Sequence, residues 1–305
     1  MPSWMIGVSV GTGRRGRAVH RADEFVDDMA RAWLGERYGA AWVAGLPALM
    51  GRLLREHHWT PVRRLTGGCT ACVLVVDGPG GRCVVKVTPC VTRSRHEAAA
   101  LEALGCSGVG PRLLDHWEEP GEVGDVSVLV TQLLGDGSSL RHESSNAPSV
   151  EALGAMLRAV EECGAQALSL RTDTLHDHLG PRLGRARGGG LHGTQAPAER
   201  ELVAARETFH ALMSPTPGTW VHGSLHPGNL VPGADGRLLV VDPRPFAADP
   251  AYDAAEVCLK WGSERHGRRH NLADGRALWR RLRRRLDHDG ERVDAWMRVL
   301  AATGF

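Results

Sequence analysis

Lysine is almost missing from this chain, because only Lys86 and Lys260 among its 37 basic residues are lysines. Arginine supplies the other positive charges, and 35 acidic residues reduce the formal net charge to +2. This balance excludes a strongly basic, dedicated polyanion binder. No apolar run approaches the roughly 18 residues that a membrane-spanning helix needs, which excludes an integral membrane protein. The two lysines stand out as the first candidates for specific roles.

Cysteine is present in an odd number, seven, and the first residues do not resemble a secretory leader, so we expect none. Both features favour a reduced, cytoplasmic setting. Cys69 and Cys72, with Cys83 and Cys90, could suggest a four-thiolate zinc site, but the second pair lacks zinc-knuckle spacing. Two of these cysteines fall within predicted strands and are expected in the core. A length of 305 residues with 42% hydrophobic residues is typical of one large domain or two fused lobes.

The pattern of apolar residues changes along the chain from helical to β and back to helical. Residues 25–54 predict two helices, with Pro47 in the first turn of the second. Three β-branched runs then predict strands, at 72–76, 83–88 and 126–131. A helix is expected at 94–104, and helices dominate from residue 150 to the end. This order predicts an α+β fold in which a small sheet-containing lobe precedes a mostly helical lobe.

Lys86 lies among β-branched neighbours in the run 83–88, where a charged side chain needs a partner or a ligand. Glu97, on the helix expected next, can supply that partner. Upstream, Gly67 and Gly68 form a turn whose backbone N–H groups could approach phosphate oxygens. A glycine turn, a strand lysine and a helix glutamate in this order are typical of the ATP-phosphate apparatus of protein kinases. Taken singly, the glycines also fit an ordinary turn, and the lysine fits an edge residue that reaches water.

A second and more specific cluster lies beyond residue 220. The run His222-Gly-Ser-Leu-His-Pro-Gly-Asn229 precedes an apolar strand that delivers Asp242, and Asp249-Pro-Ala-Tyr-Asp253 follows. This order resembles the aminoglycoside phosphotransferase superfamily, in which HGDxHxxN is followed by a hydrophobic strand and Asp. The closer likeness is to the streptomycin 6-kinase and hydroxyurea phosphotransferase branch, through Asp242-Pro-Arg-Pro245 and Ala41-Trp-Val-Ala-Gly-Leu-Pro-Ala-Leu49. The resemblance covers about residues 35 to 300, in collinear order.

The resemblance implies a protein-kinase-like two-lobed fold that binds Mg·ATP between the lobes, near Leu133 and Leu134. Lys86 would hold the α- and β-phosphates, and Glu97 would fix its position. We expect the chain to divide into a flexible extension, N-terminal helices with a nucleotide-binding lobe, and a helical lobe with the catalytic loop and substrate region, at 1–22, 23–134 and 135–305.

Asn229 and Asp242 would be the Mg²⁺ ligands, because an amide oxygen and a carboxylate suit this hard cation. The other residues of the two motifs have supporting roles in this interpretation. His222 and His226 are expected to organise the loop through hydrogen bonds to backbone. Asp249 and Asp253 are expected to cap or brace the helix that follows.

Ser224 departs from the family pattern, because it occupies the position of the aspartate that accepts the proton of the substrate hydroxyl. A neutral serine hydroxyl cannot take that proton, and a general base contributes roughly 10²–10⁴-fold to the rate. Three explanations stay open: a natural degenerate kinase, a base supplied from elsewhere, or an engineered inactivation. Asp173 and Asp177 are the candidates for a displaced base. Because the phosphoryl transition state is loose, slow transfer without a base is physically reasonable.

We therefore predict an ATP-dependent small-molecule phosphotransferase whose acceptor is a hydroxyl of an aminoglycoside such as streptomycin, or hydroxyurea, in antibiotic resistance or biosynthesis. The alternatives are a nucleotide-binding pseudokinase with a regulatory or scaffolding role, and a kinase that acts on a peptide hydroxyl. No membrane or nucleic-acid partner is expected. An arginine cluster is predicted on the solvated face of a helix packed by its leucines, namely Arg280, Arg281, Arg283, Arg284 and Arg285. The sequence predicts no oligomeric state and no role for Lys260.

Overall fold

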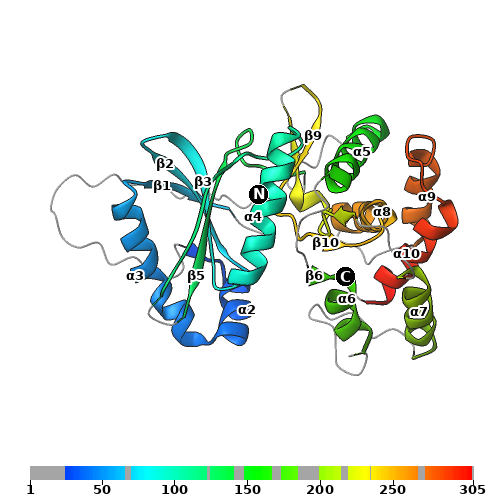
Figure 1. Cartoon of the computed structure of the whole chain (residues 1–305), viewed down its shortest axis with the longest axis horizontal. Coiled ribbons are helices and arrows are strands. Elements are labelled where there is room, and N and C mark those ends of the chain that lie inside the picture. The colour runs from blue at the N-terminus through cyan, green and yellow to red at the C-terminus, as the bar shows by residue number, and fades with distance from the viewer. Residues whose placement is uncertain are drawn as a thin grey trace, which may run out of the picture.

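The protein has a sheet-containing half and a mostly helical half, which lie side by side (Figure 1). The computed structural model describes residues 25–65, 70–121, 124–140, 148–166, 173–184, 199–213, 219–233, 235–266 and 272–303. The expected extension 1–22 and the glycine turn with Gly67 and Gly68 lie outside these residues. Within the described ranges, no helix combines the length and the apolar character needed to cross a membrane.

A five-stranded antiparallel sheet forms the centre of the first half, in the order β1-β2-β3-β5-β4 (Figure 1). Its strands are β1 (Thr60–Arg64), β2 (Cys72–Gly78), β3 (Gly81–Thr88), β4 (Leu113–Glu119) and β5 (Val126–Gln132). The predicted hairpin is confirmed, since Gly78 pairs with Gly81 across the turn between β2 and β3. Strands β1 and β4 were not predicted from the sequence. These are the two edge strands, and because neither contains a buried residue, neither carries the apolar run that identifies a central strand.

Helices cover both faces of this sheet. On one face, α2 (Asp28–Tyr38) and α3 (Ala40–Glu56) pack a buried apolar cluster against β2, β3 and β5. On the other face, α4 (Val91–Cys106) packs Leu101 against Leu129 of β5. The place predicted for Pro47 was wrong, because α3 begins at Ala40 and Pro47 lies inside the helix. An interior proline removes one N–H donor and crowds the carbonyl of the preceding turn, but the buried residues on either side of Pro47 hold the helix against the sheet.

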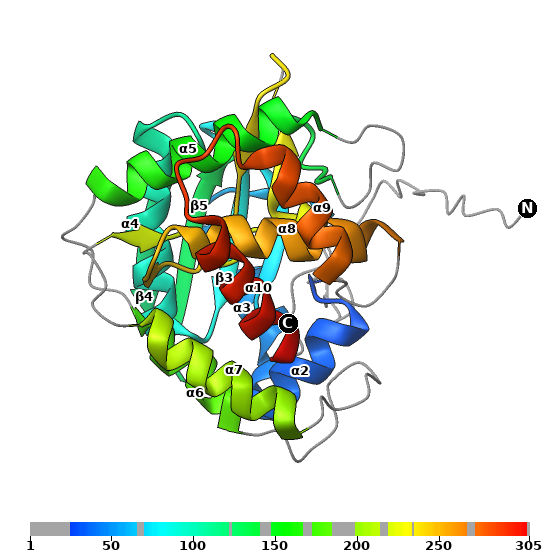
Figure 2. The same ribbon diagram turned by 90° about the vertical axis from the view of Figure 1, so that its right-hand side faces the viewer.

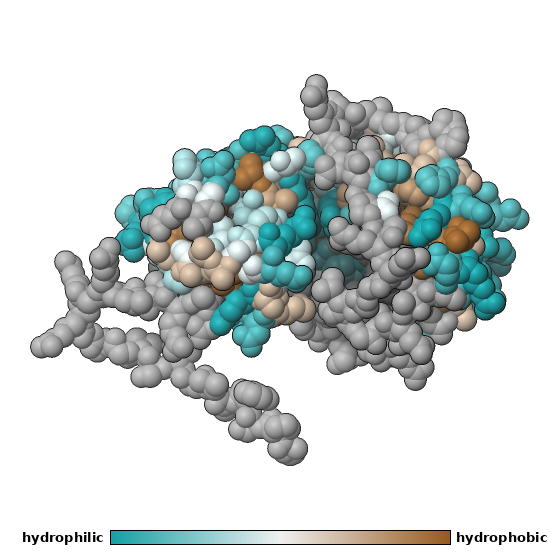
Figure 3. Space-filling model, turned by 90° about the horizontal axis from the view of Figure 1, so that it is seen from below, coloured by the Kyte–Doolittle hydropathy of each residue, from teal (hydrophilic) through white to brown (hydrophobic). Residues whose placement is uncertain are grey.

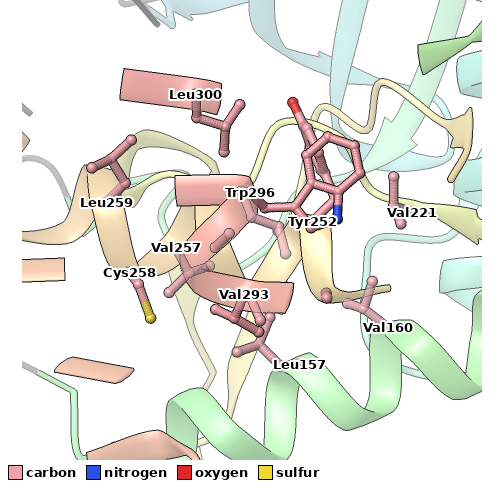
Figure 4. Close-up of a cluster of buried hydrophobic side chains, with 14 of the residues drawn as sticks. Leu157, Val160, Val221, Tyr252, Val257, Cys258, Leu259, Val293, Trp296 and Leu300 are labelled. Atoms are coloured by element: carbon pink, nitrogen blue, oxygen red, sulfur yellow. The ribbon is translucent and has the colours of Figure 1, made fainter. Parts of the chain in front are cut away.

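The second half is built around α8 (Ala251–His266), which lies between α5 (Val150–Gln166) and α10 (Gly290–Ala302) (Figure 2). The other helices of this half are α6 (Leu175–Gly184), α7 (Glu199–Leu212) and α9 (Leu272–Leu282). Tyr252 and Trp296 meet edge to face with ring centroids 5.5 Å apart at the centre of the buried cluster (Figure 4). Because α8 is buried along residues 251–260, its polar side chains are held inside the protein.

The burial predicted for the arginine cluster is confirmed, but the helix predicted to carry all of it ends too early. Leu278, Leu282 and Leu286 are buried, and the neighbouring arginines 280, 281, 283 and 284 are exposed. However, α9 ends at Leu282, so the last three arginines of the cluster lie in the turn that follows. A solvated arginine face next to buried leucines is what an amphipathic segment requires.

Short strands hold the loops between the two halves. In one small sheet, β10 (Phe246–Ala247) pairs with both β7 (Trp220–Val221) and β6 (Asp173–Thr174). In another, β8 (Leu230–Pro232) pairs with β9 (Leu238–Val240), and the 3-10 helix η1 (Pro227–Asn229) leads into β8. The Val240 amide donates a 2.9 Å hydrogen bond to the Val109 carbonyl of the first half. The end of β9 is thereby fixed against the sheet-containing half.

Candidate active site

Lys86 lies on β3, the central strand of the five-stranded sheet, between Val73 of β2 and Leu129 of β5. Its Nζ donates hydrogen bonds of 2.7 and 2.8 Å to the two carboxylate oxygens of Glu97 on α4. The side chain of Lys86 is 13% exposed and that of Glu97 is 4% exposed. The structure thus brings together the lysine and glutamate that the sequence analysis paired. A buried charge of each sign is compensated by the other.

Asp242 reaches Lys86 from the opposite half of the molecule. Lys86 Nζ lies 2.5 Å from Asp242 Oδ1, and the Asp242 side chain is 39% exposed. Burial would raise the pKa of Asp242, but Lys86 and Arg93 outweigh it and hold that pKa well below its usual range. Burial would likewise lower the pKa of Lys86, but Asp242 and Glu97 raise it. The site therefore contains a charged ammonium held between two carboxylates.

The backbone of Asp242 has a φ of 55°, which non-glycine residues seldom adopt. Asp242 follows directly after β9 and Val241, whose amide donates a 3.0 Å hydrogen bond to the Asn229 carbonyl. This bond ties the segment of Asp242 to the loop of Asn229. Backbone conformations of this kind persist where the surrounding structure fixes them, as it does at functional sites.

Ser224 and Asn229 lie next to each other on the loop between β7 and β8. Asn229 Nδ2 donates hydrogen bonds to the Ser224 carbonyl at 2.9 Å and to Ser224 Oγ at 3.2 Å. The Asn229 side-chain nitrogen is thereby used inside the loop, which leaves its Oδ1 as the atom suited to a cation. Asn229 is buried and Ser224 is half-buried.

Buried carboxylates on α8 hold the backbone of this loop from behind. Asp253 accepts hydrogen bonds from the amides of His222 and Gly223 at 2.7 and 2.9 Å. Glu256 accepts one from the Leu225 amide at 2.7 Å, and Lys260 Nζ donates to the other oxygen of Glu256 at 2.7 Å. Burial and then the nearby Glu256 raise the pKa of Asp253 to about 8.

The roles predicted for the two aspartates of the 249–253 motif have different outcomes. Asp249 Oδ1 accepts a 3.0 Å hydrogen bond from the Ala251 amide, and it therefore caps α8 as predicted. The prediction for Asp253 was wrong in its target, because Asp253 braces the backbone of the loop at His222 and Gly223 rather than the helix. Asp253 lies in the first turn of α8, but its two carboxyl oxygens are both taken by the loop amides, and neither is left to cap the helix.

The two histidines of the loop organise it in different ways. His226 Nδ1 accepts a 3.1 Å hydrogen bond from the Gly228 amide and caps η1, as predicted. His222 is fully buried, and burial lowers its pKa to about 4 against the opposing effects of Asp242 and the Val241 backbone. Its carbonyl accepts a 2.7 Å hydrogen bond from the Arg244 amide. A neutral, buried imidazole supports the loop by packing.

Gly223 leaves no room for a side chain. Its φ is 71°, and an added Cβ would lie 2.2 Å from the Arg244 carbonyl oxygen and 2.5 Å from the Phe246 ring. Only glycine satisfies both the backbone conformation and the close approach. The glycine therefore sets the path of the chain immediately before Ser224.

The connection between the two halves begins at the end of β5. Leu133 and Leu134, the residues predicted beside the nucleotide, are both half-buried and follow β5 directly. The Gly137 amide donates a 2.8 Å hydrogen bond to the Leu134 carbonyl and closes the turn that follows. Figure 3 shows a hollow with hydrophilic residues between the two halves.

Asp173 and Asp177, the candidates for a displaced base, come from the segment beside the loop. The backbone of Asp173 pairs with Phe246 in β10, and Phe246 pairs on its other side with Val221, directly before His222. Asp177 lies on α6, the helix that follows. Their elements are therefore adjacent to the loop, an arrangement that no pattern in the sequence predicts.

Two charged residues near the site were missed by the sequence analysis. Arg93 lies one helical turn before Glu97 on α4, and its charge lowers the pKa of Asp242. Glu256 supports the loop from α8. The spacing of four residues between Arg93 and Glu97 was a usable signal. For Glu256 the usable signal was its position four residues before Lys260, where the two side chains can pair on one helix face.

Sequence comparison relates the chain to enzymes that transfer phosphoryl groups. The profile of the phosphotransferase enzyme family matches residues 61–285. The streptomycin 6-kinase of Streptomyces glaucescens is 29% identical over 227 residues, which cover 73% of this chain and 69% of the relative. The streptomycin 6-kinase of Streptomyces griseus is 26% identical over 239 residues, which cover 77% and 73% of the two chains.

Structural comparison points to the same fold. The aminoglycoside phosphotransferase APH(3'')-Id from Streptomyces rimosus superimposes with a TM-score of 0.53 at 17% identity, over 85% of this chain and 99% of that chain. An aminoglycoside-3'-phosphotransferase of type VIII gives a TM-score of 0.56 at 22% identity, over 85% and 98%. At these identities the likeness shows the fold alone, and it confirms the predicted α+β, protein-kinase-like architecture.

Proposed function

Because the chain belongs to the phosphotransferase enzyme family, we propose that it transfers the γ-phosphoryl group of Mg·ATP to a hydroxyl group of a small aminoglycoside. Streptomycin is the first acceptor to test, since two streptomycin 6-kinases are among the relatives. The observation that carries the proposal is the position of Lys86 Nζ, within 2.7 Å of both Glu97 and Asp242, with one residue contributed by each half.

Lys86 is the residue we assign to the nucleotide phosphates. A compact ammonium on a buried strand can neutralise phosphate charge, and Glu97 fixes its position from α4. The nucleotide would lie against Leu133 and Leu134 at the start of the connection, with Gly67 and Gly68 over its phosphates. In this proposal residues 23–134 bind the nucleotide, and residues 135–305 supply the catalytic loop and the acceptor site.

Asn229 and Asp242 are the residues we assign to Mg²⁺. The donor set fits a hard cation, because one carboxylate and one side-chain amide oxygen are available from segments joined by a backbone hydrogen bond. Lys86 now contacts Asp242 directly. Bound Mg²⁺ would neutralise phosphate charge during transfer, and Asp242 would then exchange its contact with Lys86 for the cation.

Ser224 sets the expected rate of the reaction. In the transfer, the bond between the γ-phosphorus and the oxygen of ADP breaks, a bond to the acceptor oxygen forms, and the acceptor hydroxyl loses a proton. Ser224 Oγ accepts a hydrogen bond from Asn229 and is neutral, so it can orient the acceptor hydroxyl but cannot remove its proton. The proton would pass to water or to the transferred phosphate. A turnover lower by roughly 10²–10⁴-fold than with an aspartate is the consequence.

The same residue supports a second candidate function, a nucleotide-binding pseudokinase. All the residues assigned to the nucleotide are present in the chain, and the position of the general base is changed. A protein of this kind would bind Mg·ATP and use the bound state to regulate or assemble a partner. The two candidates differ in turnover and not in nucleotide affinity.

The experiment titrates Mg·ATP into the native chain and into Ser224→Asp by calorimetry, and measures ADP formation with streptomycin. We expect equal nucleotide affinity and a 10²–10⁴-fold higher kcat in the aspartate variant. Ser224→Ala is the matched control, since it removes the hydroxyl without adding a base.

Each outcome assigns one function. A slow native turnover that Ser224→Asp raises supports the phosphotransferase. Nucleotide binding without turnover in either protein supports the pseudokinase. The absence of Mg·ATP binding to the native chain would overturn both candidates.

A further inference from the structure

Glu256 and Lys260 form a buried ion pair directly behind the catalytic loop. Glu256 is fully buried and Lys260 is 7% exposed. Both belong to α8, four residues apart, with the glutamate on the N-terminal side, which is the favourable order for such a pair. Nothing in the function proposed above uses either residue.

The two oxygens of Glu256 have separate partners. Oε1 accepts a 2.7 Å hydrogen bond from Lys260 Nζ, and Oε2 accepts a 2.7 Å hydrogen bond from the Leu225 amide. Leu225 directly follows Ser224, which in turn accepts two hydrogen bonds from Asn229. A continuous chain of contacts therefore leads from Lys260 to the loop residues that we assign to acceptor and metal.

We propose that Glu256 and Lys260 are positioning residues of the phosphotransferase site, which hold Ser224 and Asn229 in place through the Leu225 amide. This inference rests on the proposed function for its kinetic readout. Asp253 fixes the two preceding amides, those of His222 and Gly223. Three of the amides at 222–225 are thus held by carboxyl groups from one helix, α8.

The presence of a buried ion pair behind the loop is not explained by a contribution to stability. Replacing a buried pair by apolar residues of similar volume is often neutral or even stabilising, because desolvation offsets the attraction between the charges. A carboxylate is required here to accept a strong hydrogen bond from a buried amide. Once the carboxylate is present, a compact cation must compensate it, and Lys260 supplies that charge where a planar guanidinium needs more room.

The test compares two double variants that differ only in the acceptor offered to the Leu225 amide. Glu256→Gln/Lys260→Met removes both charges and keeps a side-chain oxygen at residue 256. Glu256→Met/Lys260→Met removes both charges and the oxygen. Arg276→Met, which breaks an exposed ion pair with Asp294 on α9 and α10, is the control for loss of an ion pair in general.

We expect the Met/Met variant to lose about 10²-fold in kcat for ADP formation from Mg·ATP with streptomycin, at unchanged KM for Mg·ATP. The Gln/Met variant should lose clearly less, and Arg276→Met should match the native chain. A merely structural role predicts instead that kcat follows the melting temperature in both double variants. Equal kcat in the two double variants would overturn the proposal.

Amide hydrogen exchange at Leu225 supplies a readout that needs no turnover. The proposal predicts strong protection in the native chain and in the Gln/Met variant, and fast exchange in the Met/Met variant. If the native chain forms no ADP, the proposed function fails while this exchange still decides the role of Glu256. Fast exchange at Leu225 in the native chain would overturn the positioning role even in an active enzyme.

Discussion

The two halves of the molecule each contain one lysine, and each lysine is held by a glutamate. In the sheet-containing half, Lys86 contacts Glu97 and also reaches Asp242 across the two halves. In the helical half, Lys260 contacts Oε1 of Glu256, and Oε2 of Glu256 accepts a hydrogen bond from the Leu225 amide. The first pair is joined by a residue of the other half, and the second lies behind the loop between β7 and β8.

The two ion pairs differ in which member has an additional partner and in what that partner is. Lys86 itself has the additional partner, Asp242, whose side chain is 39% exposed and therefore open to a ligand. In the other pair, the glutamate has the additional partner, and that partner is buried backbone. The same residue types can therefore bind a ligand in one half and position a loop in the other.

Lys86→Met is the substitution with the largest expected effect. It removes the cation that we assign to the phosphates and leaves two neighbouring carboxylates without compensation. We expect Mg·ATP binding to be lost and any turnover to fall about 10³-fold or more. Calorimetry and ADP formation measure the two effects.

The matched control for that variant is Arg82→Met on the same strand, β3. Arg82 forms an exposed ion pair with Asp77 at the hairpin. Its loss should leave nucleotide affinity at the native value. Native affinity in Lys86→Met would remove the distinction between the two lysines.

Gly223→Ala tests the loop itself. The new Cβ would lie 2.2 Å from a backbone oxygen in a backbone conformation that alanine avoids. We expect a loss of about 3 kcal/mol in the free energy of unfolding, from overpacking together with the backbone penalty. Denaturant titration gives the value.

Gly236→Ala separates those two contributions. Gly236 has a similar φ of 77°, but nothing lies within 4 Å of an added Cβ. Its substitution should cost only about 1–2 kcal/mol. Equal losses at both positions would show that the contact with Arg244 and Phe246 contributes nothing.

The pH dependence of stability tests the buried groups around the loop and has the smallest expected effect. The pKa of Asp253 is raised from 3.8 to about 8, so between these pH values the folded protein keeps a proton that the unfolded chain has released. The pKa of His222 is lowered to about 4, so the unfolded chain binds a proton there up to pH 6.5. The two effects oppose each other between pH 4 and 6.5. Of these two groups, only Asp253 still changes its protonation above pH 6.5, and its effect lowers stability as the pH rises.

We expect the free energy of unfolding to decrease by about 2 kcal/mol between pH 6.5 and 8. Urea titration at several pH values measures it. In Asp253→Asn the decrease should disappear, because the titrating group is gone. An unchanged slope in that variant would assign the effect to another group.

The sequence predicted the central elements of the fold because each carried a local signal. The strands β2, β3 and β5 are buried and β-branched, and their runs were visible without any tertiary information. The edge strands β1 and β4 have no buried residues, and their structure comes from pairing with β2 and β5. Pairing of this kind leaves little pattern in a single sequence.

The candidate site shows the same limit. Lys86 and Glu97 were paired from strand and helix patterns, and Asn229 and Asp242 from a motif. The role of Lys260 was not predicted, because its effect depends on which loop α8 packs against. The scarcity of lysine drew attention to Lys260 without predicting a role for it, and only the tertiary structure shows that Glu256 is its partner.

Calorimetric titration of Mg·ATP into two variants tests the division of roles between the lysines most directly. The variants are Lys86→Met and Glu256→Met/Lys260→Met, each compared with the native chain under the same conditions. The account predicts that the first variant loses nucleotide binding and that the second keeps the native Kd. Equal loss of affinity in both variants, or native affinity in Lys86→Met, would contradict it.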